Sequence, residues 1–211
     1  MALVFILIVI NVAISLWNAY ATGKAWVEAK FAGGWPRFMT WMGAIMAASG
    51  LSWCILILLI FGFVSAGKLT PDWGQVGLEL GYIIIVPGII FSGLMITIDS
   101  WARAYRTRKI LDLGIAGYNS FAQVYNTYHA IQGMGPAISH VMSAFLGKGK
   151  KNGSVLVILL VILALGLGII ITAAIIHHVA ASTPLPSYEE AQRQLQPAQT
   201  AGGNPSEAPR P

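Results

Sequence analysis

Four long apolar stretches divide the chain and restrict its possible folds more than any other feature. They cover about residues 2–20, 41–64, 76–98 and 154–176, and Glu79 is the one charged residue within them. A helix needs about 20 apolar residues to cross a hydrocarbon core of roughly 30 Å. Only 10% of the chain is charged, whereas a soluble domain is about a quarter charged. Each stretch is therefore predicted to be a membrane-spanning helix.

The fold class that follows is all-α: a multi-pass transmembrane helical bundle formed by residues 1–180. From Ala181 to Pro211 the composition changes to Pro, Gln, Ala and Ser, which predicts a disordered tail. Within it, Pro184-Leu-Pro-Ser-Tyr188 resembles the proline-tyrosine ligands of WW domains, although Leu185 replaces the usual proline. A solvated Pro-rich tail is the competing interpretation, and composition favours it.

Residues 99–151 form the one long polar connection, between the third and fourth spans. Both its ends are basic, yet Leu113 to Leu146 contains no Asp, Glu, Lys or Arg. We expect two short amphipathic helices in the headgroup layer, separated at Gly135-Pro136. A re-entrant hairpin and a fifth span are the alternatives.

The distribution of Lys and Arg predicts how the protein is oriented. With four crossings, the 99–151 connection and the link after the first span lie on one side and hold most of the basic residues. Loops rich in Lys and Arg stay in the cytoplasm. The prediction is a plasma or bacterial inner membrane protein with residues 99–151 inside and both termini outside. Its basic residues at the inner face, Arg103, Arg106, Arg108 and Lys109, are expected to contact anionic lipid headgroups.

Small residues recur at helical spacing in two spans, at Gly43, Ala47 and Gly50 in the second and at Gly168 in the fourth. Faces of this kind let a second helix approach closely. They predict helix packing, against another span, a second copy or a larger membrane-protein complex.

The first span carries a polar stripe at Asn11, Ser15 and Asn18. Such side chains commonly hydrogen-bond between membrane helices, which is the favoured interpretation. The alternative is the wall of a polar pathway that faces a kink at Pro87 in the third span.

Residues with catalytic or metal-binding spacing are not found. His129 and His140 lie too far apart on a helix to share one metal ion, and the single cysteine, Cys54, lies within a span. We therefore expect no catalytic, cofactor or metal site and no nucleic-acid partner.

Three functional hypotheses follow. The first is a non-catalytic membrane protein, a structural or accessory subunit that oligomerises or packs with partners. The second is a small channel or transporter lined by the first span and the Pro87 kink. The third is a membrane enzyme that uses the 99–151 connection, with His129, His140, Asp112 and the Tyr residues of this connection as its candidate groups.

Overall fold

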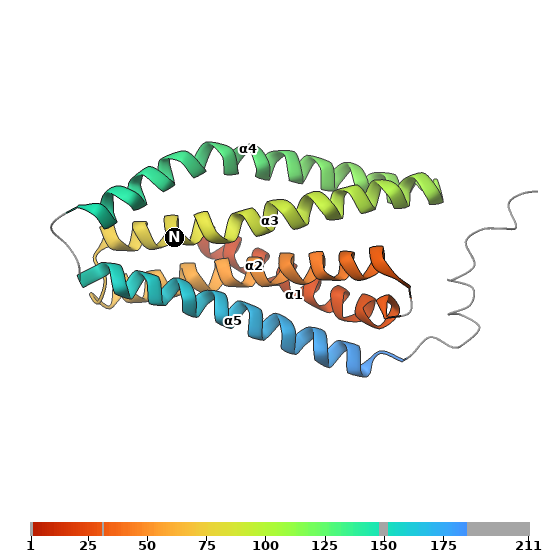
Figure 1. The fold of residues 1–211 in the computed structure, drawn as a ribbon, viewed down its shortest axis with the longest axis horizontal. Coiled ribbons are helices and arrows are strands. Elements are labelled where there is room, and N and C mark those ends of the chain that lie inside the picture. Colours follow the sequence, from red (N-terminus) through yellow and green to blue (C-terminus); the bar gives the residue numbers. More distant parts are fainter. Residues whose placement is uncertain (1, 31, 148–151, 185–211) are drawn as a thin grey trace, which may run out of the picture.

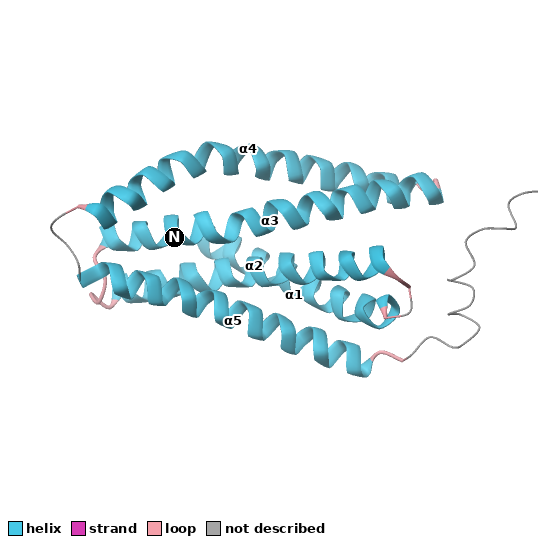
Figure 2. Cartoon of the chain, viewed as in Figure 1, coloured by secondary structure: helices cyan, strands magenta, loops and turns pink. Residues whose placement is uncertain are grey.

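In the computed structural model, which describes residues 2–30, 32–147 and 152–184, five α-helices account for nearly all of the described chain. They are α1 (Ala2–Ala29), α2 (Gly34–Ser65), α3 (Pro71–Thr107), α4 (Ile110–Leu146) and α5 (Asn152–Ser182), and they lie roughly side by side (Figures 1 and 2).

The short links between the helices follow from local sequence. Thr70 caps α3 by accepting a hydrogen bond from the backbone N–H of Trp73, and Pro71 occupies the first turn, where its missing N–H is not needed. Gly67 in the α2–α3 link has a φ of 67°, a conformation that glycine adopts without strain. At the opposite end, the Arg37 guanidinium donates to the carbonyls of Ala29 and Lys30 and so caps the end of α1.

The prediction of four membrane spans is confirmed. Phe5–Ala29, Gly34–Ser65, Pro71–Thr107 and Gly153–Ser182 are each long and apolar enough to cross a bilayer. The first predicted span lies inside α1, and the other three lie inside the remaining three ranges.

The prediction of two short helices separated at Gly135-Pro136, and the alternative of a re-entrant hairpin, are wrong. Residues 110–146 form one helix of 37 residues that continues through Pro136 and lies along α3 (Figure 1). At 1.5 Å per residue α4 is about 55 Å long. Contacts with α3 on both sides of Pro136 hold the helix together: the Tyr82 hydroxyl donates to the His129 carbonyl before it, and His140 pairs with Glu79 after it.

This helix changes the route of the chain. Because α4 begins at one end of the bundle and finishes at the other, α1, α3 and α5 run in one direction and α2 and α4 run in the opposite direction (Figure 1). The first residues of α1 and the last residues of α5 therefore lie at opposite ends. This differs from the expectation that both termini share one side, and from the expectation that residues 99–151 stay at one end.

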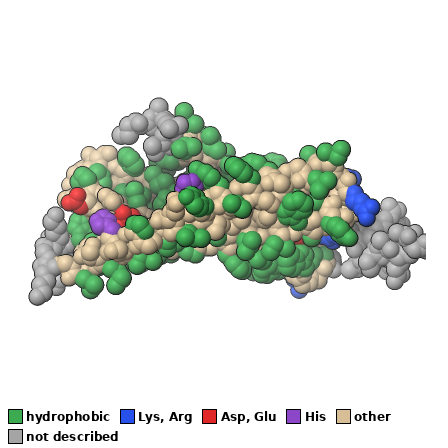
Figure 3. Space-filling model, turned by 90° about the horizontal axis from the view of Figure 1, so that it is seen from above, with side chains coloured by type: hydrophobic (Ala, Val, Ile, Leu, Met, Phe, Trp, Pro, Cys, Tyr) green, Lys and Arg blue, Asp and Glu red, His purple; other side chains and the backbone are tan. Residues whose placement is uncertain are grey.

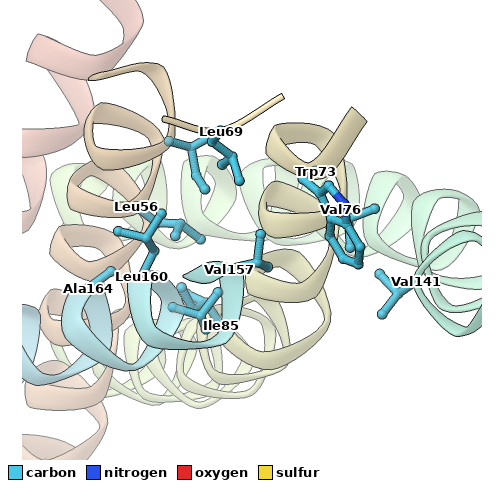
Figure 4. Close-up of a cluster of buried hydrophobic side chains, with 11 residues drawn as sticks. Leu56, Leu69, Trp73, Val76, Ile85, Val141, Val157, Leu160 and Ala164 are labelled. Carbon is cyan, nitrogen blue, oxygen red and sulfur yellow. The ribbon is translucent and has the colours of Figure 1, made fainter. Parts of the chain in front are cut away.

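The buried core lies at the end of the bundle that holds the α2–α3 link. It combines Leu56 of α2, Trp73 and Ile85 of α3, and Val157 and Val161 of α5 with several neighbours (Figure 4). Val141 is the buried α4 residue in this cluster. α1 does not contribute to the cluster and instead packs against α2 and α5.

Candidate functional site

The longest polar feature is a row of hydrogen bonds between α3 and α4, which we call the α3–α4 seam. Besides one at the α3–α4 turn, five side-chain hydrogen bonds cross it, joining Glu79 to His140, Tyr82 to the His129 carbonyl, Gln123 to the Ile90 carbonyl, Thr97 to the Asn119 carbonyl and Trp101 to Ser120. Two of these hydrogen bonds are 2.8 Å long, from Gln123 Nε2 to Ile90 O and from Trp101 Nε1 to Ser120 Oγ. Interhelical hydrogen bonds of this kind stabilise the association of helices in a membrane, where the hydrophobic effect does not drive it. The seam explains why α4 can be polar and still lie along a membrane span.

A short hydrogen bond between Glu79 and His140 joins α3 to α4 at one end of the seam. Glu79 Oε2 lies 2.5 Å from His140 Nδ1, and Gln75 Nε2 donates to Glu79 Oε1 at 2.9 Å. Both carboxylate oxygens therefore have partners. The Glu79 side chain is 22% exposed and the His140 side chain is 43% exposed. The arrangement fixes the register of α4 on α3. It does not include a third ionisable group of the kind that a metal would need, and no such cluster exists in the described part of the chain.

The other residues of the predicted enzyme site are separated. His129 lies against the rings of Tyr125 and Tyr128. Asp112 accepts a hydrogen bond from Thr107 at the α3–α4 turn. His129 and His140 are eleven residues apart on α4, which is about 16 Å. These groups are not brought to one place.

The predicted helix-packing residues lie at contacts within the chain. A Cβ added at Gly43 or Gly50 would overlap Thr22 or Ser15 of α1, and Ala47 is fully buried. Gly168 of α5 is equally close to α2, where an added Cβ would lie 2.9 Å from the Ala48 carbonyl oxygen. These faces therefore join α2 to α1 and α5, and a partner protein would not reach them in this fold.

Sequence reasoning missed a second glycine face, on α3. Cβ atoms added at Gly74, Gly77 and Gly81 would crowd Val64, Ile60 and Leu56 of α2. Their spacing of three and four residues was a readable signal of a helix contact.

The polar stripe of α1 is divided between two environments. Ser15 is buried against α2, Asn18 is half-buried, and Asn11 is exposed with its amide bonded to the Leu7 carbonyl of its own helix. Pro87 lies on α3, and α2 packs between α1 and α3. The stripe and Pro87 are therefore not brought together across one cavity.

Exposed cations gather at one end of the bundle, which we call the cationic end. In the described residues this end holds Lys24, Lys30, Arg37, Arg103, Arg106, Arg108 and Lys109. The opposite end holds Lys68, and Lys148, Lys150 and Lys151 lie outside the described residues. Figure 3 shows blue side chains at one end of the face it draws, and acidic and His side chains toward the other. Asp99 and Arg103, one turn apart on α3, form an ion pair with 3.6 Å between Oδ2 and Nη2.

A cavity of about 670 Å³ opens between α1, α2 and α5 near the cationic end. Its walls are mostly apolar, and its polar residues are Trp26, Lys30, Trp41, Thr172 and His177. A smaller cavity of about 110 Å³ adjoins it and shares Trp26, Lys30 and Trp41, with Arg37 and Thr40 added. No sequence signal placed these residues together, because they come from three helices.

Comparison of the chain with protein-family models, curated protein sequences and solved structures finds no match.

Proposed function

We propose that this chain is a non-catalytic integral membrane protein, a structural or accessory subunit that assembles by pairing α4 with α4 of a second copy. The supporting observation is an exposed stripe along α4 that no other helix covers. α4 packs along α3 and leaves its outer face open, where Tyr118, Phe121, Tyr125 and Tyr128 are each more than half exposed.

The spacing of this outer α4 stripe favours a helical partner. Its residues alternate at steps of three and four, and all of them are exposed: Leu111, Gly114, Tyr118, Phe121, Tyr125, Tyr128, Gln132, Gly135, Ser139, Met142 and Leu146. A repeat of 3.5 residues sustained over five heptads is the pattern of two helices wound around each other. Gly114 and Gly135 would let the backbones approach.

Gln132 favours a second copy as that partner. It lies in the middle of the stripe, is exposed, and has no hydrogen-bond partner among the described residues. A primary amide both donates and accepts, so it is complementary to itself. Two copies inserted in the same direction place their Gln132 residues at the same depth, as two-fold symmetry requires.

The cationic end supports a cytosolic orientation, in a plasma or bacterial inner membrane, because Lys and Arg are retained on the cytosolic side. α4 is paired with α3 along its length, and it would therefore be a fifth crossing. The first residues of α1 would then face outward, and the last residues of α5 would face the cytosol.

Association in liposomes tests the proposal. Energy transfer between labelled copies, measured at increasing protein density, should give a saturable dimer. Gln132→Leu should weaken association about fivefold, since a hydrogen bond between membrane helices contributes about 1 kcal/mol. The introduced leucine gains no compensating hydrophobic stabilisation on association, because lipid tails are as apolar as leucine.

Asn126→Leu is the matched control, because Asn126 is also an exposed amide of α4 but lies about 120° around the helix from Gln132. It should leave the association constant unchanged. Energy transfer no greater than random proximity at every density, or equal weakening by both variants, would reject pairing through this stripe.

A further inference from the structure

The geometry points to a binding site for an anionic phospholipid in the cavity between α1, α2 and α5. One acyl chain would occupy the larger chamber, and the phosphate would lie in the smaller chamber between Lys30 and Arg37. This site is distinct from the proposed α4 pairing surface, and neither proposal depends on the other.

The larger chamber has the size and lining of a ligand site. Its volume of about 670 Å³ falls within the range of pockets that enclose small molecules. Along α5 it extends from Ile169 to Ala181, which is about 18 Å of helix. Small side chains form much of its wall, including Ala44, Ala48 and Ala173. An extended hydrocarbon chain parallel to the helices fits this shape.

The smaller chamber provides the charge. Lys30 and Arg37 both line it, and Trp26 and Trp41 form the wall that it shares with the acyl-chain chamber. The two indole rings pack edge to face, with centroids 5.2 Å apart. Arg37 uses Nε and Nη2 to cap α1, which fixes its guanidinium in place, and the group has five N–H donors in total. Two cations beside aromatic rings suit a phosphate at headgroup depth.

Binding to purified full-length protein in neutral detergent tests the site. The probes are phosphatidylglycerol and phosphatidylcholine with the same acyl chains. We expect phosphatidylglycerol to bind at least fivefold more tightly, since one cation near an anionic headgroup contributes roughly that factor. Lys30→Gln should remove most of this preference. Lys24→Gln is the matched control, because Lys24 is an exposed lysine of the same helix that lies over the Tyr20 ring and outside both cavities.

A second variant tests the acyl-chain chamber. Ala173→Phe places a ring in the chamber from an exposed position of α5 and should abolish binding of both lipids, while helical content is retained. Glycerol phosphate, which has no acyl chain, should not compete. Equal affinity for the two lipids, equal losses in Lys24→Gln and Lys30→Gln, binding that survives Ala173→Phe, or competition by glycerol phosphate would each overturn the proposal.

Discussion

Gly168 lies where α5 approaches α2 most tightly. A Cβ added there would lie 2.8 Å from the backbone nitrogen of Ser52 and 2.9 Å from the carbonyl oxygen of Ala48. Backbone atoms cannot rotate away as a side chain can, so the two helices would have to separate. Two residues earlier, a Cβ added at Gly166 meets no atom within 4 Å. The contact between α5 and α2 therefore requires glycine at position 168 but not at position 166.

Gly168→Ala is predicted to lower the free energy of unfolding by about 1–3 kcal/mol, the usual effect of overpacking. Gly166→Ala should raise it by about 0.5–1 kcal/mol, because alanine is the better helix former. Unfolding of both variants in mixed micelles measures the difference. A Gly168→Ala protein as stable as Gly166→Ala would contradict the close approach of α2 and α5.

At the scale of elements, the sequence predicted the four membrane spans but not the single long helix α4. Hydropathy identified the four spans, because burial in lipid requires long apolar runs. It did not predict α4 as one helix along α3, because the polar side chains of α4, such as Gln123 and Ser120, bond to α3. Partners that lie 33 and 19 residues away along the chain cannot be read from local spacing.

The candidate sites divide in the same way. The glycine faces and the exposed stripe at Tyr118 and Phe121 follow helical spacing and are readable in the sequence. Glu79 and His140 are 61 residues apart, and the cavity residues come from three helices. Those groups meet only through the tertiary fold.

The α3–α4 seam predicts energetic coupling between Glu79 and His140. In a double-mutant cycle with Glu79→Gln and His140→Phe, the coupling free energy should be about 1 kcal/mol, within the range measured for such pairs in membranes. Unfolding measurements on the two single variants and the double variant give this value. Additive effects would show that the register of α4 is set by other contacts.

At the scale of the whole molecule, the alternating directions of the helices give five passes along the bundle. α3 and α5 run in the same direction, so the chain must return over the length of the bundle between them, and α4 is that return. Both Lys109 and Ser182 consequently lie at the cationic end, whereas Lys68 and Gly147 lie at the opposite end. The cytosolic orientation that we propose for the last residues of α5, and the lipid site beside them, depend on this route.

Cysteine accessibility across the membrane tests that route most directly. In a Cys54→Ala background, which removes the single native cysteine, Lys109→Cys and Gly147→Cys place one thiol at each end of α4. With an impermeant maleimide added to intact cells, Gly147→Cys should react at once and Lys109→Cys only after the membrane is opened. Reaction of both positions from the same side would contradict the fifth crossing.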